Sequence, residues 1–355
     1  MNKKKSSLHE NEGVSQPETT SKNAAEKIKF SRARQNSVDE YVSKILAGDI
    51  PFLSRAITLV ESTSEAHQQK ANEILERCLP YANASVRIGI TGVPGVGKST
   101  FIETFGKQYT AIGKKVAVLA VDPSSSVNKG SILGDKTRME ELVTDENAFI
   151  RPSPSGTSLG GVAQKTRESI ILCEAAGFDT IIIETVGVGQ SETVVHSMVD
   201  FFLLLKLTGA GDELQGIKRG IIEMADAIVI HKADGENIQN AKIAKVAFQR
   251  ALHLYPVKES KWQPKVLTAS AINKTGIAEI EELIASYVKQ TKESAYFEER
   301  RNEQNQFWLR ATIEQQLKAD FYRNPKVKAA LSEEIINLEN GTTTPFNAAK
   351  RLLTI

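Results

Sequence analysis

The chain has 355 residues, 41% of them hydrophobic and 25% charged, and its 45 basic and 43 acidic residues leave a net charge of +2. The near balance of charge argues against a dedicated nucleic-acid surface, and no run of about 18 apolar residues exists that would span a membrane. Only two cysteines, Cys78 and Cys173, are present and neither lies in a Cys/His cluster, which argues against a disulfide framework or zinc site and favours the reducing cytoplasm.

The N-terminal part of the chain divides into two segments. Residues 1–36 are rich in Ser, Asn, Glu, Lys and Thr, so burial cannot offset the entropy lost on ordering, and we expect a disordered tail. Its basic start is followed by no apolar stretch, which argues against a secretory signal. From 37 to 84 apolar residues recur at helical spacing, which predicts two or three helices ahead of the main domain.

Between residues 85 and 292 short apolar runs alternate with longer helical segments. The runs are VRIGI (86–90), KVAVLAV (115–121), TIIIET (180–185), FFLLLKL (201–207), AIVIH (227–231) and KVLTAS (265–270). This alternation predicts an α/β fold with a mostly parallel sheet covered by helices on both faces. Because ligands of such sheets bind at the carboxyl ends of the strands, the loops after these runs are the candidate sites.

After one more amphipathic helix at 275–291, the segment 293–355 is charged and helical in pattern. An apolar stripe that includes Trp308 and Leu317 recurs every three or four residues. The segment must bury this stripe either on the main domain or against a second chain, and the pattern leaves both possibilities open.

The first run is followed by GVPGVGKST, which fits the phosphate-binding pattern G-x-x-x-x-G-K-[ST] between a strand and a helix. In this pattern backbone N–H groups surround the phosphates, Lys98 reaches the β- and γ-phosphates, and Ser99 Oγ binds Mg²⁺. The helix expected at 99–112 points its positive N-terminal end at the phosphates. The residues of this predicted phosphate loop are Gly92, Val93, Pro94, Gly95, Val96, Gly97, Lys98, Ser99 and Thr100.

Acidic side chains follow or end two further runs. Asp122 could organise Mg²⁺ or its waters, although Asp-Pro is equally consistent with a simple turn. Asp135 lies in a Gly-bounded loop that could order around a γ-phosphate or stay solvated. Glu184 lies near the end of its strand, and Gly187 three residues later could bring a backbone N–H close to a γ-phosphate, as in GTPase switch loops.

The catalytic part of these loops is incomplete by the standard of small GTPases. Many of them carry a water-orienting Gln directly after the switch glycine, whereas this chain has Val188. We therefore expect slow unassisted hydrolysis unless Gln190 or another loop supplies the group. The glycine-rich, charged connection 208–226 is consistent with an ordinary exposed crossover and also with a third switch loop.

Two more strand ends carry residues suited to guanine recognition, namely His231, Lys232 and Asp234, and Ser270, Ala271 and Ile272. The Asp234 carboxylate can accept from the N1–H and amine of guanine, while a Ser-Ala backbone N–H donates to O6. Adenine presents the opposite pattern, so these residues favour GTP over ATP. Lys232 is expected to lay its alkyl stem over the base or the phosphate loop. His231 stands where Asn is usual, and its ring offers only part of the usual bracing of that loop.

Several stretches are specific enough to indicate a family: GVPGVGKST, AVDPSSS with GSILGDKTRM, RPSPSGTSLGGVAQKTRE, ETVGVGQSE and GAGDELQGIKRGI. Through them the chain resembles the MeaB/ArgK family of P-loop GTPases, which includes the human methylmalonic aciduria type A protein. The resemblance implies a GTPase core at 85–292, a helical N-terminal extension at 37–84, and a C-terminal helical arm at 293–355 that forms a homodimer.

The resemblance further implies a GTP-dependent chaperone that gates cofactor loading into an adenosylcobalamin-dependent acyl-CoA mutase, chiefly methylmalonyl-CoA mutase, and protects or reactivates it. Lys218, in the loop 209–220 that senses the mutase, would approach the nucleotide when the partner docks. The residues expected around Mg²⁺ or its waters are Ser99, Asp122, Asp135 and Glu184. The expected catalytic residues are Lys98, Glu184, Gly187 and Lys218.

Three other functions are alternatives: a nucleotide-dependent scaffold that hardly hydrolyses GTP, a metal-delivery GTPase, and a kinase for an amino-acid transport protein. The metal-delivery function would need a Cys/His cluster that the sequence does not display. The guanine-type residue Asp234 and the lack of an evident phospho-acceptor site argue against the kinase.

Overall fold

The computed structural model describes residues 36–121, 139–152, 159–185, 191–208 and 219–355. Four of the predicted site residues, Asp122, Asp135, Gly187 and Lys218, lie outside these ranges, as do Val188 and Gln190. Nearly all of the predicted tail lies outside them as well.

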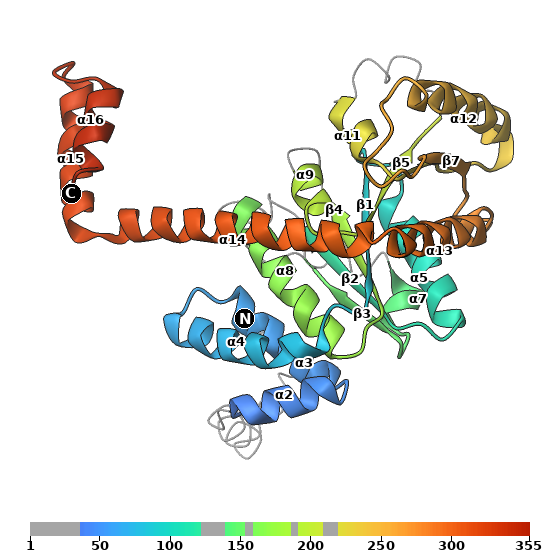
Figure 1. The fold of residues 1–355 in the computed structure, drawn as a ribbon, viewed down its shortest axis with the longest axis horizontal. Coiled ribbons are helices and arrows are strands. Elements are labelled where there is room, and N and C mark those ends of the chain that lie inside the picture. The colour runs from blue at the N-terminus through green and yellow to red at the C-terminus, as the bar shows by residue number, and fades with distance from the viewer. Residues whose placement is uncertain (1–35, 122–138, 153–158, 186–190, 209–218) are drawn as a thin grey trace, which may run out of the picture.

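A seven-stranded parallel sheet forms the centre of the described chain, in the order β3-β2-β4-β1-β5-β6-β7 (Figure 1). The strands are β1 (Val86–Gly92), β2 (Val116–Val121), β3 (Ala148–Arg151), β4 (Thr180–Thr185), β5 (Phe201–Lys206), β6 (Ala227–Ile230) and β7 (Lys265–Thr268). Strands β2, β4, β5 and β6 are buried along their whole length, which explains their unbroken apolar runs. The predicted α/β class is confirmed.

Helices cover both faces of the sheet. On one face lie α5 (Lys98–Ala111), α7 (Glu140–Val143) and α13 (Ile277–Glu293). On the other lie α8 (Leu159–Ala175), α9 (Ser191–His196), α11 (Arg219–Met224) and α12 (Ile238–Leu252). The helices predicted at 99–112 and 275–291 are thus present as α5 and α13.

One strand is missing from the sequence prediction. β3 has four residues, only one of which is buried, so it shows neither a long apolar run nor a clear alternation. It pairs with β2 at the edge of the sheet, and Arg151 at its end forms an ion pair with Glu61 of the N-terminal helices. Its place in the sheet is therefore set by distant contacts.

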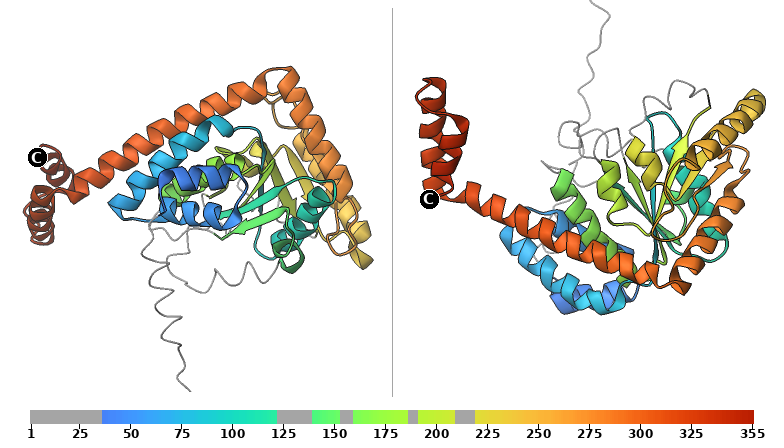
Figure 2. Two further views of the ribbon diagram at one scale, coloured as in Figure 1. Left: turned by 90° about the horizontal axis from the view of Figure 1, so that it is seen from below. Right: turned by 45° about the horizontal axis from the view of Figure 1, so that its top comes forward.

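The N-terminal helices are α2 (Val38–Leu46), α3 (Ile50–Glu61) and α4 (Glu65–Cys78), followed by a 3₁₀ turn at Leu79–Tyr81. Ser37 and Asp49 are the N-caps of the first two helices: Ser37 Oγ accepts from Glu40 N, and Asp49 Oδ1 accepts from Phe52 N. Fully buried side chains such as Ile45, Leu53 and Ile57 join these helices to α8 in one core. The N-terminal helices lie against α8 (Figure 2). The predicted two or three helices are three.

The C-terminal segment consists of α14 (Tyr296–Arg323), α15 (Pro325–Glu339) and α16 (Pro345–Leu352). The buried residues of α14 are Phe297, Arg301, Gln304 and Trp308, all in its first half, which runs beside α8. Beyond them α14 leaves the body and carries α15 and α16 away from it (Figures 1 and 2). The first half therefore packs on the main domain.

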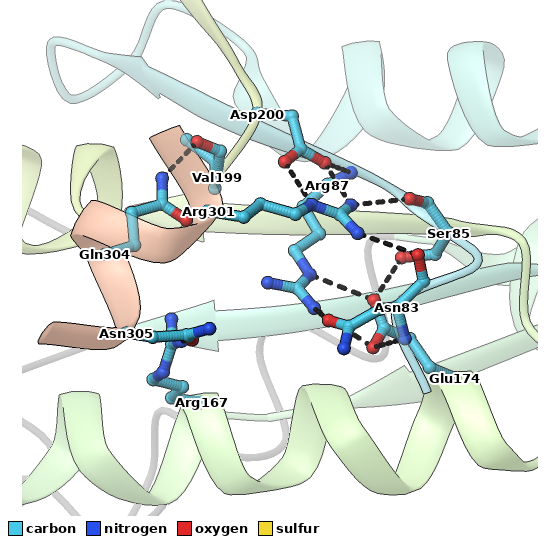
Figure 3. A network of polar contacts seen from close by, with 10 residues as sticks. All are labelled: Asn83, Ser85, Arg87, Arg167, Glu174, Val199, Asp200, Arg301, Gln304 and Asn305. Carbon is cyan, nitrogen blue, oxygen red and sulfur yellow. Dashed lines mark hydrogen bonds and ion pairs between the residues drawn. The ribbon is translucent and has the colours of Figure 1, made fainter. Parts of the chain in front are cut away.

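A buried polar network fixes α14 to the body (Figure 3). Arg301 donates from Nε and Nη2 to both carboxylate oxygens of Asp200, at 2.8 and 2.7 Å, and to the carbonyls of Asn83 and Ser85. Gln304 Nε2 donates to Val199 O at 2.8 Å. Such paired and fully bonded charges are tolerated in a core, whereas an isolated one is costly.

A second ion pair continues the same network. Arg87 of β1 donates to both oxygens of Glu174 in α8, at 2.9 and 3.0 Å, and Ser85 Oγ donates to the same carboxylate. Burial acts to raise the pKa of Glu174, but the Arg87 guanidinium outweighs it and holds the pKa below its ordinary value. The carboxylate is therefore ionised at neutral pH.

Candidate nucleotide-binding site

The predicted phosphate loop connects β1 to α5 at the carboxyl edge of the sheet. Gly95 and Gly97 have φ of 80° and 91°, the left-handed region that favours glycine. A Cβ at Gly97 would lie 3.0 Å from His231 Cε1, so this position requires glycine both for its conformation and for its close contact. The helix α5 begins at the next residue, with its backbone N–H groups toward the loop.

The loop presents its lysine and hydroxyls at the start of α5. Lys98 Nζ donates to Gly92 O at 2.8 Å, across the turn. Val96 is fully buried and anchors the loop, while Pro94 and Gly95 are exposed. Ser99 and Thr100 lie in the first turn of α5. The arrangement fits a phosphate group held by the helix terminus and a lysine.

His231, at the end of β6, contacts the phosphate loop directly. Its Nδ1 lies 2.7 Å from Val96 O, and since a carbonyl only accepts, Nδ1 carries the proton. Burial lowers the pKa of His231, although the hydrogen bond to Val96 acts against it, so the ring is neutral. Among the described residues the buried Nε2 atom has no hydrogen-bond partner. The expectation of partial bracing agrees with this geometry: one side of the ring is bonded.

Lys232 adds a second connection from the base loop to the phosphate loop. It adopts φ of 56°, and its Nζ donates to Gly95 O at 2.9 Å. Its carbonyl accepts from Asn237 Nδ2 at 2.6 Å, which holds the turn after β6. The alkyl stem therefore lies along the phosphate loop, one of the two positions expected from sequence.

Asp234 and Ser270 come together across the two loops predicted to read the base. Ser270 Oγ donates to Asp234 Oδ2 at 2.5 Å and accepts from Asn273 N at 3.1 Å. Ser270 is fully buried and Ala271 nearly so, whereas Ile272 is 78% exposed. The carboxylate is thus oriented by a hydroxyl beside it, as a base-reading group requires.

Glu184 lies in β4 with its Cα opposite Ile90 of β1 and Ala120 of β2, and it is 4% exposed. Of the predicted magnesium ligands, the described ranges contain Glu184 and Ser99. Carboxylate and hydroxyl oxygens are the ligand types that Mg²⁺ prefers, so these residues fit the ion by chemistry. No group of three or more His, Cys, Asp or Glu side chains suited to a metal occurs within the described residues.

Two supporting contacts were not predicted from sequence. Thr104 of α5 donates from Oγ1 to Ala271 O at 3.2 Å, joining the phosphate helix to the second base loop. The Thr185 and Thr91 hydroxyls are hydrogen-bonded at 2.9 Å between β4 and β1. A single Thr carries no local signal of such a role. Asn237, which bonds Lys232 O, does carry one, because Asn in a turn such as DGEN commonly bonds nearby backbone.

Comparison with known proteins identifies the family. Residues 53–326 match the family described as "Methylmalonyl Co-A mutase-associated GTPase MeaB". The chain belongs to this family. "GTPase ArgK" of Escherichia coli (strain K12) is 45% identical over 313 residues, covering 88% of this chain and 95% of the relative. The "Methylmalonic aciduria type A homolog, mitochondrial" of Mus musculus is 42% identical over 334 residues, covering 91% and 80%.

A solved structure agrees with this assignment. The crystal structure named "LAO/AO transport system kinase" is 39% identical, with a TM-score of 0.71 over 89% of this chain and 96% of that one. Membership of the MeaB family, whose relatives are named GTPases, supports GTPase activity and guanine-nucleotide binding. Within the described residues, no helix combines the length and apolar character needed to cross a bilayer.

Proposed function

We propose that this MeaB family member is a GTP-binding and GTP-hydrolysing chaperone that gates cofactor loading into an adenosylcobalamin-dependent acyl-CoA mutase of the methylmalonyl-CoA type, and protects or reactivates that enzyme. The observation that carries the proposal is the match of residues 53–326 to a family named for its association with methylmalonyl-CoA mutase. The name of the mouse relative points to the same metabolic step.

Selection of GTP rests on the base loops. Asp234, held by Ser270, accepts from the N1–H and amine of guanine, while adenine would leave this carboxylate without a donor. Backbone N–H groups of Ala271 and Ile272 serve the O6 position. Because His231 and Lys232 are hydrogen-bonded to the phosphate loop, the base and phosphate sites are coupled.

Hydrolysis rests on residues at the strand ends. Lys98 stabilises charge on the transferred phosphoryl group, and Gly187 presents a backbone N–H to it. Mg²⁺, when bound, would neutralise phosphate charge, held by Ser99 and Glu184 with Asp122 and Asp135. Since Val188 cannot orient a water molecule, turnover is slow until the mutase docks and brings Lys218 to the nucleotide.

The arm supports a homodimer. Beyond Trp308 the apolar side chains Leu309, Ile313 and Leu317 recur every four residues, so they lie on one side of α14, and all three are exposed in the single chain. A projecting stripe of this kind is typical of a helix that packs on a second chain. The proposal also includes the division of the chain into an N-terminal extension (37–84), a GTPase core (85–292) and the arm (293–355). It includes a cytoplasmic location, which the two buried cysteines without a disulfide favour.

A kinase function is the second candidate, because a structure 39% identical to this chain carries the name of a transport system kinase. Kinase activity would transfer the γ-phosphoryl group to a protein, so incubation with labelled GTP and candidate transport proteins should give a phosphoprotein. We rank it second because the base loop and the family both point to a GTPase.

The experiment that tests the proposal is cofactor loading. Cofactor-free mutase is mixed with adenosylcobalamin and this protein carrying GDP, GTP or a non-hydrolysable GTP analogue, and holoenzyme formation is followed by the cobalamin absorbance. We expect the rate and extent of loading to depend on which nucleotide is bound. Loading that is the same with every nucleotide, and the same without this protein, would remove the gating function.

A further inference from the structure

A groove of about 640 Å³ lies between the C-terminal half of α12 and β7, and no residue of the nucleotide-site loops lines it. Its walls are α12, the connection after it, and the start of β7, the last strand of the sheet. Three residues of β7, Lys265, Val266 and Leu267, belong to this lining.

The groove has a one-sided charge. Its lining includes Lys245, His253, Lys258 and Lys265 but no Asp or Glu. Lys258 is engaged, since its Nζ donates to Asp226 and to the carbonyls at the end of α11. Lys245 and Lys265 form no ion pair with any described residue. The segment 238–268 carries six basic residues (Lys242, Lys245, Arg250, Lys258, Lys261, Lys265) against one acid, Glu259, in a chain whose net charge is +2.

Apolar surface lies beside these cations. Val257, in the lining, is 76% exposed, and the neighbouring Leu254 is 86% exposed. Trp262 is buried in the wall, with Lys265 Nζ 5.7 Å from the centre of its ring. A concave site with cations around apolar side chains fits a polypeptide, whereas a bilayer would need a convex or flat face.

We infer that the groove docks an extended acidic segment of a protein partner, and, resting on the proposed function, that this partner is the mutase. Acidic side chains complement Lys245 and Lys265, and apolar ones pack on Val257. A second, smaller groove continues the same walls to Ile222 and Glu223 of α11 and also includes Glu259, so the lining without acids is that of the first groove alone. Lys258, which lines both grooves, donates to Met224 O at the end of α11. A segment that extends into the second groove contacts α11, which begins at Arg219, within the loop 209–220 predicted to sense the mutase.

The test compares the double variant Lys245→Glu/Lys265→Glu with the unmutated protein, both as full-length chains. Affinity for purified methylmalonyl-CoA mutase from the same organism is measured at low and high salt. We expect roughly tenfold or greater weakening at low salt and a shallower salt dependence. The matched control is Lys114→Glu/Lys289→Glu, two exposed lysines before β2 and in α13, with the same change of charge. GTP affinity and basal hydrolysis should be unchanged in both double variants, which verifies that they fold.

A third variant, Val257→Ser, changes an exposed apolar side chain without altering charge, and it should weaken mutase binding equally at both salt concentrations. If the double variant binds the mutase as tightly as the control variant does, the groove is not the docking site, while the proposed function stands. If the unmutated protein binds no mutase, the proposed function fails and takes this inference with it. If the double variant instead loses binding to anionic phospholipid vesicles or duplex DNA and keeps the mutase, the occupant is not an acidic protein segment.

Discussion

At the scale of single residues, His231 determines how the base loop meets the phosphate loop. One ring nitrogen is bonded to Val96 O, and the other is buried without a partner among the described residues. A buried unsatisfied nitrogen costs about 1–3 kcal/mol. The shorter Asn side chain offers a donor and an acceptor, and it lacks the ring nitrogen that His231 buries without a partner.

We therefore predict that His231→Asn leaves guanine preference unchanged and preserves or tightens nucleotide affinity, whereas Asp234→Asn abolishes the preference. The measurement is competition of GTP, ATP and xanthosine triphosphate against a fluorescent guanine nucleotide. Equal competition by GTP and ATP on the unmutated protein would show that Asp234 does not read the base.

His196 gives a pH-dependent prediction. Burial, and then the nearby positive charges of Arg300 and Lys258, lower its pKa to about 3, against an ordinary value near 6.5. Between these values the unfolded chain binds a proton that the folded protein does not, so the free energy of unfolding falls as pH drops from about 6.5 toward 3. Each pH unit in this window costs up to about 1.4 kcal/mol.

The measurement is urea unfolding at a series of pH values. His196→Gln should flatten the loss of stability between neutral pH and about pH 4. The exposed His67 provides the control, since His67→Gln should leave the slope as it is. An unchanged slope in the His196 variant would place the acid sensitivity elsewhere.

At the scale of elements, what could be predicted depends on how far apart the interacting residues are in the sequence. The phosphate loop and the strand before it are local, so the pattern at 86–100 was sufficient. The same holds for the helices α2 to α5, of which α2 and α3 also begin at a side-chain N-cap. The buried network was not predictable, because Arg301 and Asn83 are 218 positions apart and a charged residue in a helical pattern predicts a solvated face.

The site follows the same rule. Asp234 and Ser270 were both named from their strand ends, but their direct hydrogen bond, and the contact of Thr104 with Ala271, depend on how α5 and β7 pack. The four predicted residues outside the described ranges stay predictions.

The network predicts how firmly α14 is attached. Arg301→Leu leaves Asp200 buried without its bidentate partner, and removing one member of a buried pair costs about 3–5 kcal/mol. Urea unfolding should show this loss, whereas Arg310→Leu, an exposed residue of the same helix, should change stability by no more than about 0.5 kcal/mol. Similar losses in the two variants would mean that the ion pair does not fix the arm.

At the scale of the whole molecule, the arm extends beyond its attachment and exposes an apolar stripe. If the stripe forms a homodimer, Leu309→Glu/Leu317→Glu should yield a monomer by sedimentation equilibrium, because a charge at the centre of an apolar interface is not compensated. GTP affinity should be retained, since the stripe lies on the half of α14 that projects from the body (Figure 1). A dimer of unchanged stability would contradict the assignment of the arm.

The sequence has Val188 where many small GTPases have a water-orienting Gln, and in the structure His231 and Lys232 are hydrogen-bonded to the predicted phosphate loop. These features agree with an enzyme whose rate is set by a docked partner. Activation by ordering of loops is a common means of such control.

The most direct measurement is the steady-state rate of GTP hydrolysis by the full-length protein, alone and with saturating methylmalonyl-CoA mutase from the same organism. The account predicts slow hydrolysis alone, a clear increase with the mutase, and no hydrolysis of ATP under either condition. A rate that stays the same with the mutase present, or ATP hydrolysed as fast as GTP, would contradict it.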